Sequence, residues 1–261
     1  MEGFETLLLE ISPSGILQIS LNRPDKLNSL SKQLLDELRQ VLEHAHDNNQ
    51  IKAIIITGIG KAFCAGADIH RLADLDAQQG GEFSTHGQQV FRRLETIGKP
   101  SIAAVNGAAI GGGCELAMAT TLRIASESAK FAQPEVKLGI IPGYGGTQRL
   151  SRLVGIGRAM EMCLTGRMVE AQQALAWGLI NEVCPSADLL GRAYQLLQGI
   201  IEMAPLAIAS TMQVIDTGFD LPIEEAFRLE AIHFGLNCAT NDKKEGVQAF
   251  LQKRKPQFRG E

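Results

Sequence analysis

Two short runs of apolar or β-branched residues constrain the fold of this chain more than any other feature. They are Ala53 to Thr57 and Ile102 to Val105. Strands that are buried on both faces have this composition, and both faces of a sheet are buried only where helices cover them. The segments between the runs carry helical patterns, so the first two thirds of the chain predict an α/β layer fold.

The N-terminal segment predicts a hairpin followed by a helix. Residues 6–11 and 15–21 have strand composition and flank the turn signal Ser12-Pro13-Ser14-Gly15. Ser31 is a candidate N-cap for the helix. One buried helical face is indicated by Leu34, Leu35, Leu38, Val41, Leu42 and Ala45.

Strand signals fade after about Gly145, and the rest of the chain predicts helices. The expected helices are 158–164, 170–177, 189–203, 206–214 and 223–234. No Gly/Ser/Pro-rich linker separates the two parts of the chain. We therefore expect one domain over residues 1–261, with a helical C-terminal region from 196 to 261.

Charge and cysteine content limit the classes of function. A net charge of -4 and a pI near 5.8 argue against a general nucleic-acid or membrane-surface binder, which needs a basic excess. The five cysteines are odd in number and form no CxxC pair, which is typical of reduced thiols. The histidines are scattered, so we expect no metal site. The start of the chain has no targeting pattern, and we expect a cytoplasmic location.

Three glycine-dense loops are the candidate binding elements, and each follows an apolar run. They span residues 63–68, 106–115 and 141–147. None is a GxxxxGK[ST] loop, which disfavours nucleotide binding. A helix beginning near Cys114 would direct the N–H groups of residues 111–113 outward, where they suit a developing oxyanion. The glycines are equally compatible with tight turns and close packing alone.

Two glutamates in these surroundings are candidate acid–base catalysts. Glu115 lies in the first turn of an otherwise apolar helix, and Glu135 follows Gln133-Pro134. Each has a simpler explanation, Glu115 as a first-turn acid that favours the helix dipole and Glu135 as an exposed loop acid. Two carboxylates in different environments are what acid–base chemistry on one substrate requires. The spacing leaves open whether they meet.

The sequence resembles the enoyl-CoA hydratase/isomerase (crotonase) family over nearly its whole length. The likeness is carried by ordered motifs, namely Leu21-Asn-Arg-Pro24 with Leu27-Asn-Ser-Leu30, Phe63 to Asp68, Ala103 to Ala117, Gln133-Pro-Glu135, Gly139 to Gly143 and Gly145 to Leu150. The resemblance implies a crotonase-like spiral of ββα units over residues 1–195 and a helical C-terminal trimerisation region. It also implies a homotrimer or a dimer of trimers.

The same resemblance assigns roles to individual residues. It implies that the N–H groups of Ala67 and Gly112 form an oxyanion hole, and that Glu115 activates water while Glu135 donates a proton to C2. Gly143 matches a backbone position near the water. The residues that match CoA contacts are Lys26, Ala67, Asp68, Ile69, His70, Phe250 and Lys253. From the residues alone, Asp68 could be a metal carboxylate or a helix N-cap, of which the cap is favoured, and the basic tail is a solvated end.

The expected activity is enoyl-CoA hydration, the syn addition of water to a 2-trans-enoyl-CoA that gives 3-hydroxyacyl-CoA. CoA is then part of the substrate, and no separate cofactor is expected. There are two alternatives: an enoyl-CoA isomerase, or a non-catalytic binding protein of the same fold. His70 stands where many members have lysine, Tyr144 replaces a common alanine, and Asn237-Cys238 interrupts a usually apolar stretch. These departures concern substrate choice and CoA contacts.

Overall fold

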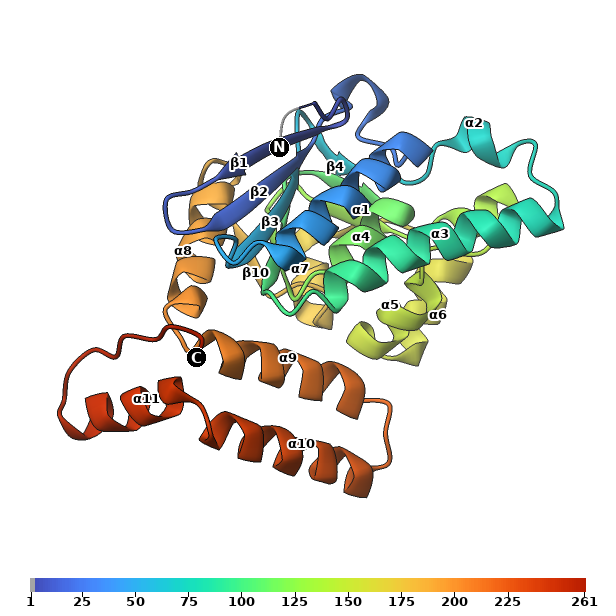
Figure 1. Ribbon diagram of the computed structural model, residues 1–261. Helices are drawn as coiled ribbons and strands as arrows, with labels where there is room; N and C mark the ends of the chain where they lie inside the picture. The colour runs from blue at the N-terminus through green and yellow to red at the C-terminus, as the bar shows by residue number, and fades with distance from the viewer. Residues whose placement is uncertain (1–2) are drawn as a thin grey trace.

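The computed structural model describes residues 3–261, apart from the side chain of His70. It contains two sheets flanked by helices (Figure 1). The larger sheet has the order β1 (Leu7–Ile11), β2 (Ile16–Leu21), β3 (Ala53–Gly58), β5 (Ser101–Val105), β7 (Leu122–Ser126) and β10 (Glu182–Cys184). The smaller sheet has the order β4 (Ala62–Cys64), β6 (Ala108–Ile110), β8 (Lys130–Ala132) and β9 (Val169–Glu170).

From β3 to β8 the chain alternates between the two sheets, and a helical segment follows each pair of strands. β3 and β4 lead to α2 (Ile69–Leu72) and α3 (Ala77–Glu95), β5 and β6 lead to α4 (Gly112–Met118), and β7 and β8 lead to the 3-10 turn η2 (Glu135–Leu138). The strands β2, β3, β5, β7 and β10 are parallel in the larger sheet, as are β4, β6 and β8 in the smaller one. This spiral of ββα units confirms the predicted fold class.

The predicted hairpin and first helix are present. β1 and β2 pair antiparallel, so that Leu7 lies opposite Leu21. The turn η1 (Pro24–Lys26) follows, and then α1 (Lys32–Asp47) begins after its N-cap Ser31, whose hydroxyl accepts a hydrogen bond from the Leu34 N–H at 3.1 Å. The whole predicted apolar face of α1 is buried. In Figure 1, α1 and α3 cover one face of the larger sheet.

The core occupies both faces of the larger sheet, as the apolar runs predict. Ile54 and Ile56 of β3 point into the main cluster, together with the buried side chains of α1 and α3. Ile55 points the other way, into a cluster that includes Leu189 and Leu197 of α8 (Leu189–Ile201). A strand enclosed in this way needs apolar side chains at every position.

Six further α-helices form most of the chain after Gly145, but the expectation that strands end there is wrong. The helices are α5 (Gly146–Val154), α6 (Ile156–Thr165), α7 (Ala171–Trp177), α9 (Pro205–Gly218), α10 (Ile223–Cys238) and α11 (Asn241–Leu251), and the 3-10 turn η3 (Ser186–Asp188) precedes α8. β9 and β10 also lie beyond Gly145. They escape prediction because two or three residues show no periodicity, and their pairing partners β8 and β7 are distant in sequence. The division at residue 196, which lies within α8, stays a prediction.

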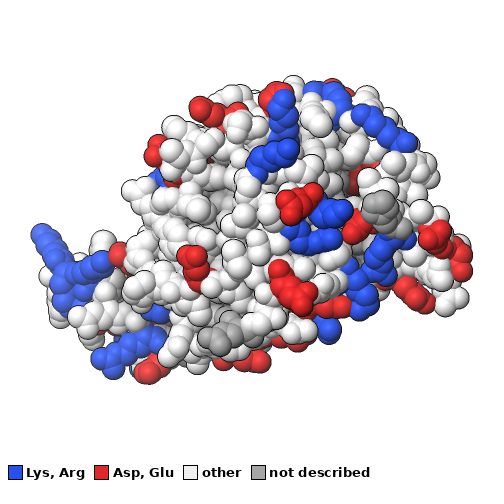
Figure 2. All heavy atoms as spheres, turned by 90° about the horizontal axis from the view of Figure 1, so that it is seen from above, with Lys and Arg blue, Asp and Glu red and all other residues white. Residues whose placement is uncertain are grey.

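Acidic and basic side chains are interspersed on the molecular face shown in Figure 2. This arrangement fits a chain of small net negative charge. Among the described residues, no helix combines the length and the apolar character that crossing a membrane would require.

Candidate active site

The residues expected to carry chemistry lie just beyond the carboxyl ends of three neighbouring strands. Ala67 follows β4, Gly112 and Glu115 follow β6, and Glu135 follows β8. These three strands are parallel, with Ala62 beside Ala108 and Ala108 beside Lys130. Parallel strands end at the same edge of a sheet, and ligands of α/β sheets bind at that edge. The topology therefore brings the three loops together.

Two backbone N–H groups in these loops, those of Ala67 and Gly112, have no acceptor in the described part of the chain. Leu30 donates its N–H to the Gly66 carbonyl oxygen at 2.8 Å and accepts from the Asp68 N–H at 3.2 Å, so the intervening Ala67 N–H faces away from Leu30. Gly112 begins α4, where N–H groups have no partner within the helix. No group among the described residues accepts a hydrogen bond from either N–H. Both are available to a ligand oxygen.

Glycine at position 113 allows α4 to lie directly against β4. A Cβ atom at Gly113 would stand 2.0 Å from the Cys64 carbonyl oxygen, which no side chain tolerates. In the adjoining loop, a Cβ at Gly66 would lie 3.8 Å from the Gly112 nitrogen. The glycines therefore permit the close packing that sets the Ala67 and Gly112 loops side by side.

Glu115 is a buried carboxylate held by backbone donors. Its Oε1 accepts hydrogen bonds from the N–H groups of Tyr144 at 2.8 Å and Gly146 at 2.6 Å. Burial, and after it the charge of Glu135, raise the pKa of Glu115 to about 7 against the effect of these bonds. The carboxyl group can thus gain or lose a proton near neutral pH.

Glu135 faces the same space from η2. A Cβ at Gly111 would lie 2.6 Å from Glu135 Oε1, so this carboxylate stands beside the residue that precedes Gly112. Burial raises the pKa of Glu135 as well. The sequence could not bring these two carboxylates together, but in the structure the charge of Glu135 lies close enough to raise the pKa of Glu115.

Two polar residues of the site were missed by sequence reasoning. Gln133 is fully buried, and its amide NH₂, turned toward Glu135, reaches Oε2 at 3.1 Å and Oε1 at 3.2 Å. Arg149 pairs with Glu95 at 2.5 Å, and its charge acts to lower the pKa of Glu115. A polar residue directly before Pro134-Glu135 was a usable signal for Gln133. Nothing local marked Arg149.

The expected CoA contacts fall into two separate groups. Ala65 donates its N–H to the Leu27 carbonyl oxygen at 2.9 Å, which sets the loop that contains Lys26 beside the loop of Asp68. Ile69, at the start of α2, is exposed. Asp68 lies 3.5 Å from Arg23. The expected contact by the His70 side chain lies outside the described part of the chain.

The C-terminal group, Phe250 and Lys253, is not brought to these loops within one protomer. Phe250 belongs to α11 and is 83% exposed, and Lys253 follows that helix. In Figure 1, α11 and α2 lie at opposite ends of the molecule. Gly143, by contrast, lies beside the carboxylates, because the N–H of the next residue, Tyr144, donates to Glu115.

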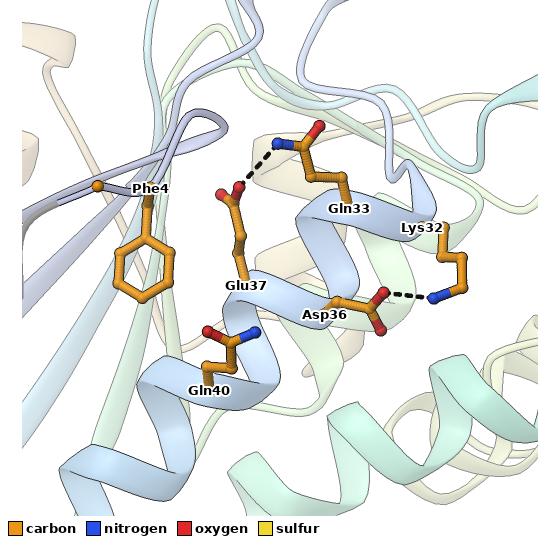
Figure 3. A pocket seen from close by; sticks show the side chains of 7 residues that line it. Phe4, Lys32, Gln33, Asp36, Glu37 and Gln40 are labelled. Carbon is orange, nitrogen blue, oxygen red and sulfur yellow. Dashed lines mark hydrogen bonds and ion pairs between the residues drawn. The ribbon is translucent and has the colours of Figure 1, made fainter.

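A hollow beside α1 contains none of the expected site residues (Figure 3). Its lining is Gly3, Phe4, Lys32, Gln33, Asp36, Glu37 and Gln40. Glu37 accepts from the Thr6 N–H at 2.9 Å and from the Gln33 amide at 3.0 Å. Its carboxylate therefore ties the N-terminal segment to α1, a structural role.

Free backbone donors beside two carboxylates of raised pKa define an enzyme that performs acid–base chemistry next to a polarised oxygen. The comparisons agree, and the chain belongs to the enoyl-CoA hydratase/isomerase family, whose model matches residues 12–261.

Similar proteins support the same assignment. The chain is 44% identical to the short-chain-enoyl-CoA hydratase of Clostridium acetobutylicum over 91% of each chain. It is 43% identical to the crotonyl-CoA hydratase of Syntrophomonas wolfei over 98% of each. The crystal structure of an enoyl-CoA hydratase from Bacillus anthracis superposes with a TM-score of 0.94 at 38% identity, covering 98% of this chain and 100% of that one. The family predicted from the motifs is confirmed.

Proposed function

We propose that this enzyme hydrates 2-trans-enoyl-CoA thioesters, with Glu115 and Glu135 as its acid–base pair. The observation that carries the proposal is the convergence of both carboxylates on the loops of Ala67 and Gly112. The names of the relatives, short-chain-enoyl-CoA hydratase and crotonyl-CoA hydratase, support it.

The proposed reaction begins with the thioester carbonyl oxygen bound by the N–H groups of Ala67 and Gly112. These donors withdraw electron density, so C3 becomes electrophilic and the enolate that forms is stabilised. Glu115 takes a proton from water as the oxygen bonds to C3. Glu135 delivers a proton to C2, and the C2–C3 double bond is lost.

The environments of the two carboxylates suit these roles. Both backbone donors reach Oε1 of Glu115, which leaves Oε2 to accept the proton of a water. Burial raises the pKa of both carboxyl groups, to about 7 for Glu115, so Glu115 can take up and release a proton near neutral pH. The step leaves Glu115 protonated and Glu135 ionised, so the net addition is one water once a proton has passed from Glu115 back to Glu135. We propose that no separate cofactor takes part.

The test is the loss of crotonyl-CoA absorbance with purified protein. We expect Glu115→Gln and Glu135→Gln each to lower kcat by ~100-fold or more, because each removes a proton-transfer group. Wild-type rates in the double variant would refute the assignment. An isomerase, which can work with one carboxylate, would instead convert a 3-enoyl-CoA to the 2-enoyl isomer and form no 3-hydroxyacyl-CoA.

We infer short-chain substrates from Tyr144 and from the relatives' names. The Tyr144 ring is buried beside Gly112, where a Cβ would lie 3.1 Å from the ring. Phe83 and Phe91 pack against it with centroids at 5.2 and 5.6 Å. This aromatic cluster fills the space next to the proposed oxyanion hole.

We propose assembly as a homotrimer or dimer of trimers, with Phe250 and Lys253 reaching the CoA of a neighbouring subunit. The exposed apolar side chains of α10 and α11 support an interface there, among them Phe227, Phe234, Phe250 and Leu251. A cytoplasmic location stays a prediction.

A further inference from the structure

The peptide group between Gly143 and Tyr144 is held at both of its ends. Its N–H donates to Glu115 Oε1 at 2.8 Å. Its carbonyl oxygen accepts from the Gln88 side-chain amide at 2.9 Å and from the Ser84 hydroxyl. One peptide plane therefore connects the buried carboxylate to α3.

Ser84 and Gln88 form a single unit on α3. They are one helical turn apart, and Gln88 also donates to the Ser84 hydroxyl oxygen at 2.9 Å. Between them Gly87 faces the Tyr144 ring, where a Cβ would come within 2.2 Å of a ring carbon. α3 thus approaches the 143–146 loop closely enough for both side chains to reach its backbone.

The last turn of α3 reaches the next carbonyl of the same loop through an ion pair. Glu95 binds Arg149 through both carboxylate oxygens, at 2.5 and 3.0 Å. Arg149 in turn donates to the Tyr144 carbonyl oxygen at 2.6 Å. The loop that supplies Glu115 with its two N–H donors is therefore held by α3 through two consecutive carbonyl groups, those of Gly143 and Tyr144.

We propose that Ser84 and Gln88 are positioning residues for Glu115, acting through the Gly143–Tyr144 peptide. Donors on a carbonyl oxygen polarise the peptide group and strengthen its N–H as a donor. They also keep that N–H directed at Oε1, which favours the ionised form of Glu115. The inference rests on the proposed hydratase function, in which Glu115 must be ionised to take a proton from water.

The charged and titratable groups around Glu115 come from other elements than α3. They are Glu135 of η2, Arg149 of α5, Tyr144 of the loop, Cys114 of α4 and Cys163 of α6. Ser84 and Gln88 are uncharged. Replacing them leaves those groups in place and changes the surroundings of Glu115 only through the peptide.

The experiment measures kcat/KM for crotonyl-CoA against pH in Ser84→Ala, Gln88→Ala and the double variant. With a weaker N–H donor, Glu115 holds its proton to higher pH, so the acid limb should move upward by about half a pH unit in the double variant. We expect kcat to fall about tenfold, and KM to change by less than about twofold because neither residue is among the expected CoA contacts.

Two controls separate positioning from general stability. Gln89→Ala removes an exposed glutamine from the same helix and should leave the profile unchanged. Ser84→Thr keeps the hydroxyl donor and should restore most of the rate lost in Ser84→Ala.

A double variant with the wild-type profile and kcat, whether or not its unfolding midpoint in urea falls, would overturn the inference and leave the hydratase proposal intact. A wild-type protein that does not hydrate crotonyl-CoA would overturn both.

Discussion

At the scale of single residues, the raised pKa of Glu115 means that its ionisation at high pH destabilises the folded state. A carboxyl group with a pKa of about 7 in the folded state and 4.5 in the unfolded state is ionised less readily when folded. Its contribution is therefore destabilising above pH 7, and the penalty fades as the pH falls through 7 toward 4.5. Glu115→Gln should abolish this dependence.

We compare the free energy of unfolding of Glu115→Gln with that of wild type at two pH values. The difference should favour the variant by about 2 kcal/mol more at pH 8 than at pH 5. The glutamine oxygen can still accept from the Tyr144 and Gly146 N–H groups. Urea denaturation at the two pH values measures the difference. An identical stability gap at pH 5 and pH 8 would contradict a raised pKa.

Tyr144 gives a second prediction at this scale, on substrate size. Tyr144→Ala should raise the ratio of octenoyl-CoA to crotonyl-CoA turnover by about tenfold, since removing a ring opens space worth several methylene groups. Tyr144→Phe is the matched control. It keeps the ring and removes a buried hydroxyl that has no hydrogen-bond partner among the described residues, so stability should hold or rise. Equal ratios in all three proteins would show that the ring does not limit chain length.

The sequence identifies residues whose type alone indicates a chemical role. It does not identify residues that act through the backbone of another segment. Glu115 and Glu135 are visible because acids are rare in apolar, glycine-rich loops. Ser84 and Gln88 are ordinary polar residues of an amphipathic helix. Their role depends on a carbonyl oxygen almost 60 positions away in sequence, at Gly143, which only the folded chain brings within reach.

At the scale of elements, the C-terminal end of α1 depends on a lysine from outside the helix. The Lys99 ammonium donates to the carbonyl oxygens of Ala45, His46 and Asn48. Carbonyl groups in the last turn of a helix have no partner within it. One side chain therefore supplies the donors that would otherwise come from water or a C-cap.

Lys99→Met should lower the free energy of unfolding by about 1–3 kcal/mol, because it leaves these carbonyls without their donor and keeps the aliphatic stem. Lys52→Met, at an exposed position, is the control and should change it by less than about 0.5 kcal/mol. Denaturant unfolding measures both. Equal effects of the two substitutions would mean that Lys99 does not cap α1.

Length helped the prediction of an element but did not decide it, since α5 and α11, with nine and eleven residues, were not among the predicted helices. α1 has a side-chain N-cap and four turns of periodic apolar residues, and its predicted start agrees with the structure. β9 and β10 have two and three residues, and exist because β8 and β7 offer unpaired edges. Such strands are products of tertiary pairing, and local sequence carries no signal for them.

At the scale of the whole molecule, the C-terminal helices expose many large apolar side chains, and a group of such side chains is typical of an interaction surface. α9 and α10 lie side by side below the sheets in Figure 1, and α11 follows them. On α10, Phe227 is 57% and Phe234 is 72% exposed. Burial of these rings between protomers would remove them from water and carry α11 toward a neighbouring subunit.

The double variant Phe227→Asp, Phe234→Asp should therefore shift the protein from an oligomer to a monomer, since a buried charge opposes the interface. Sedimentation velocity at micromolar concentration measures this shift.

If Phe250 and Lys253 contact the CoA of a neighbour, the same variant should raise KM for crotonyl-CoA by about tenfold. Its kcat should fall less than about threefold, because both glutamates belong to one protomer. Ile11→Asp places the same charge on an exposed apolar residue of β1 and should alter neither quantity. A wild-type monomer would refute the assembly, whereas a monomeric variant with unchanged KM would refute only the contact across subunits.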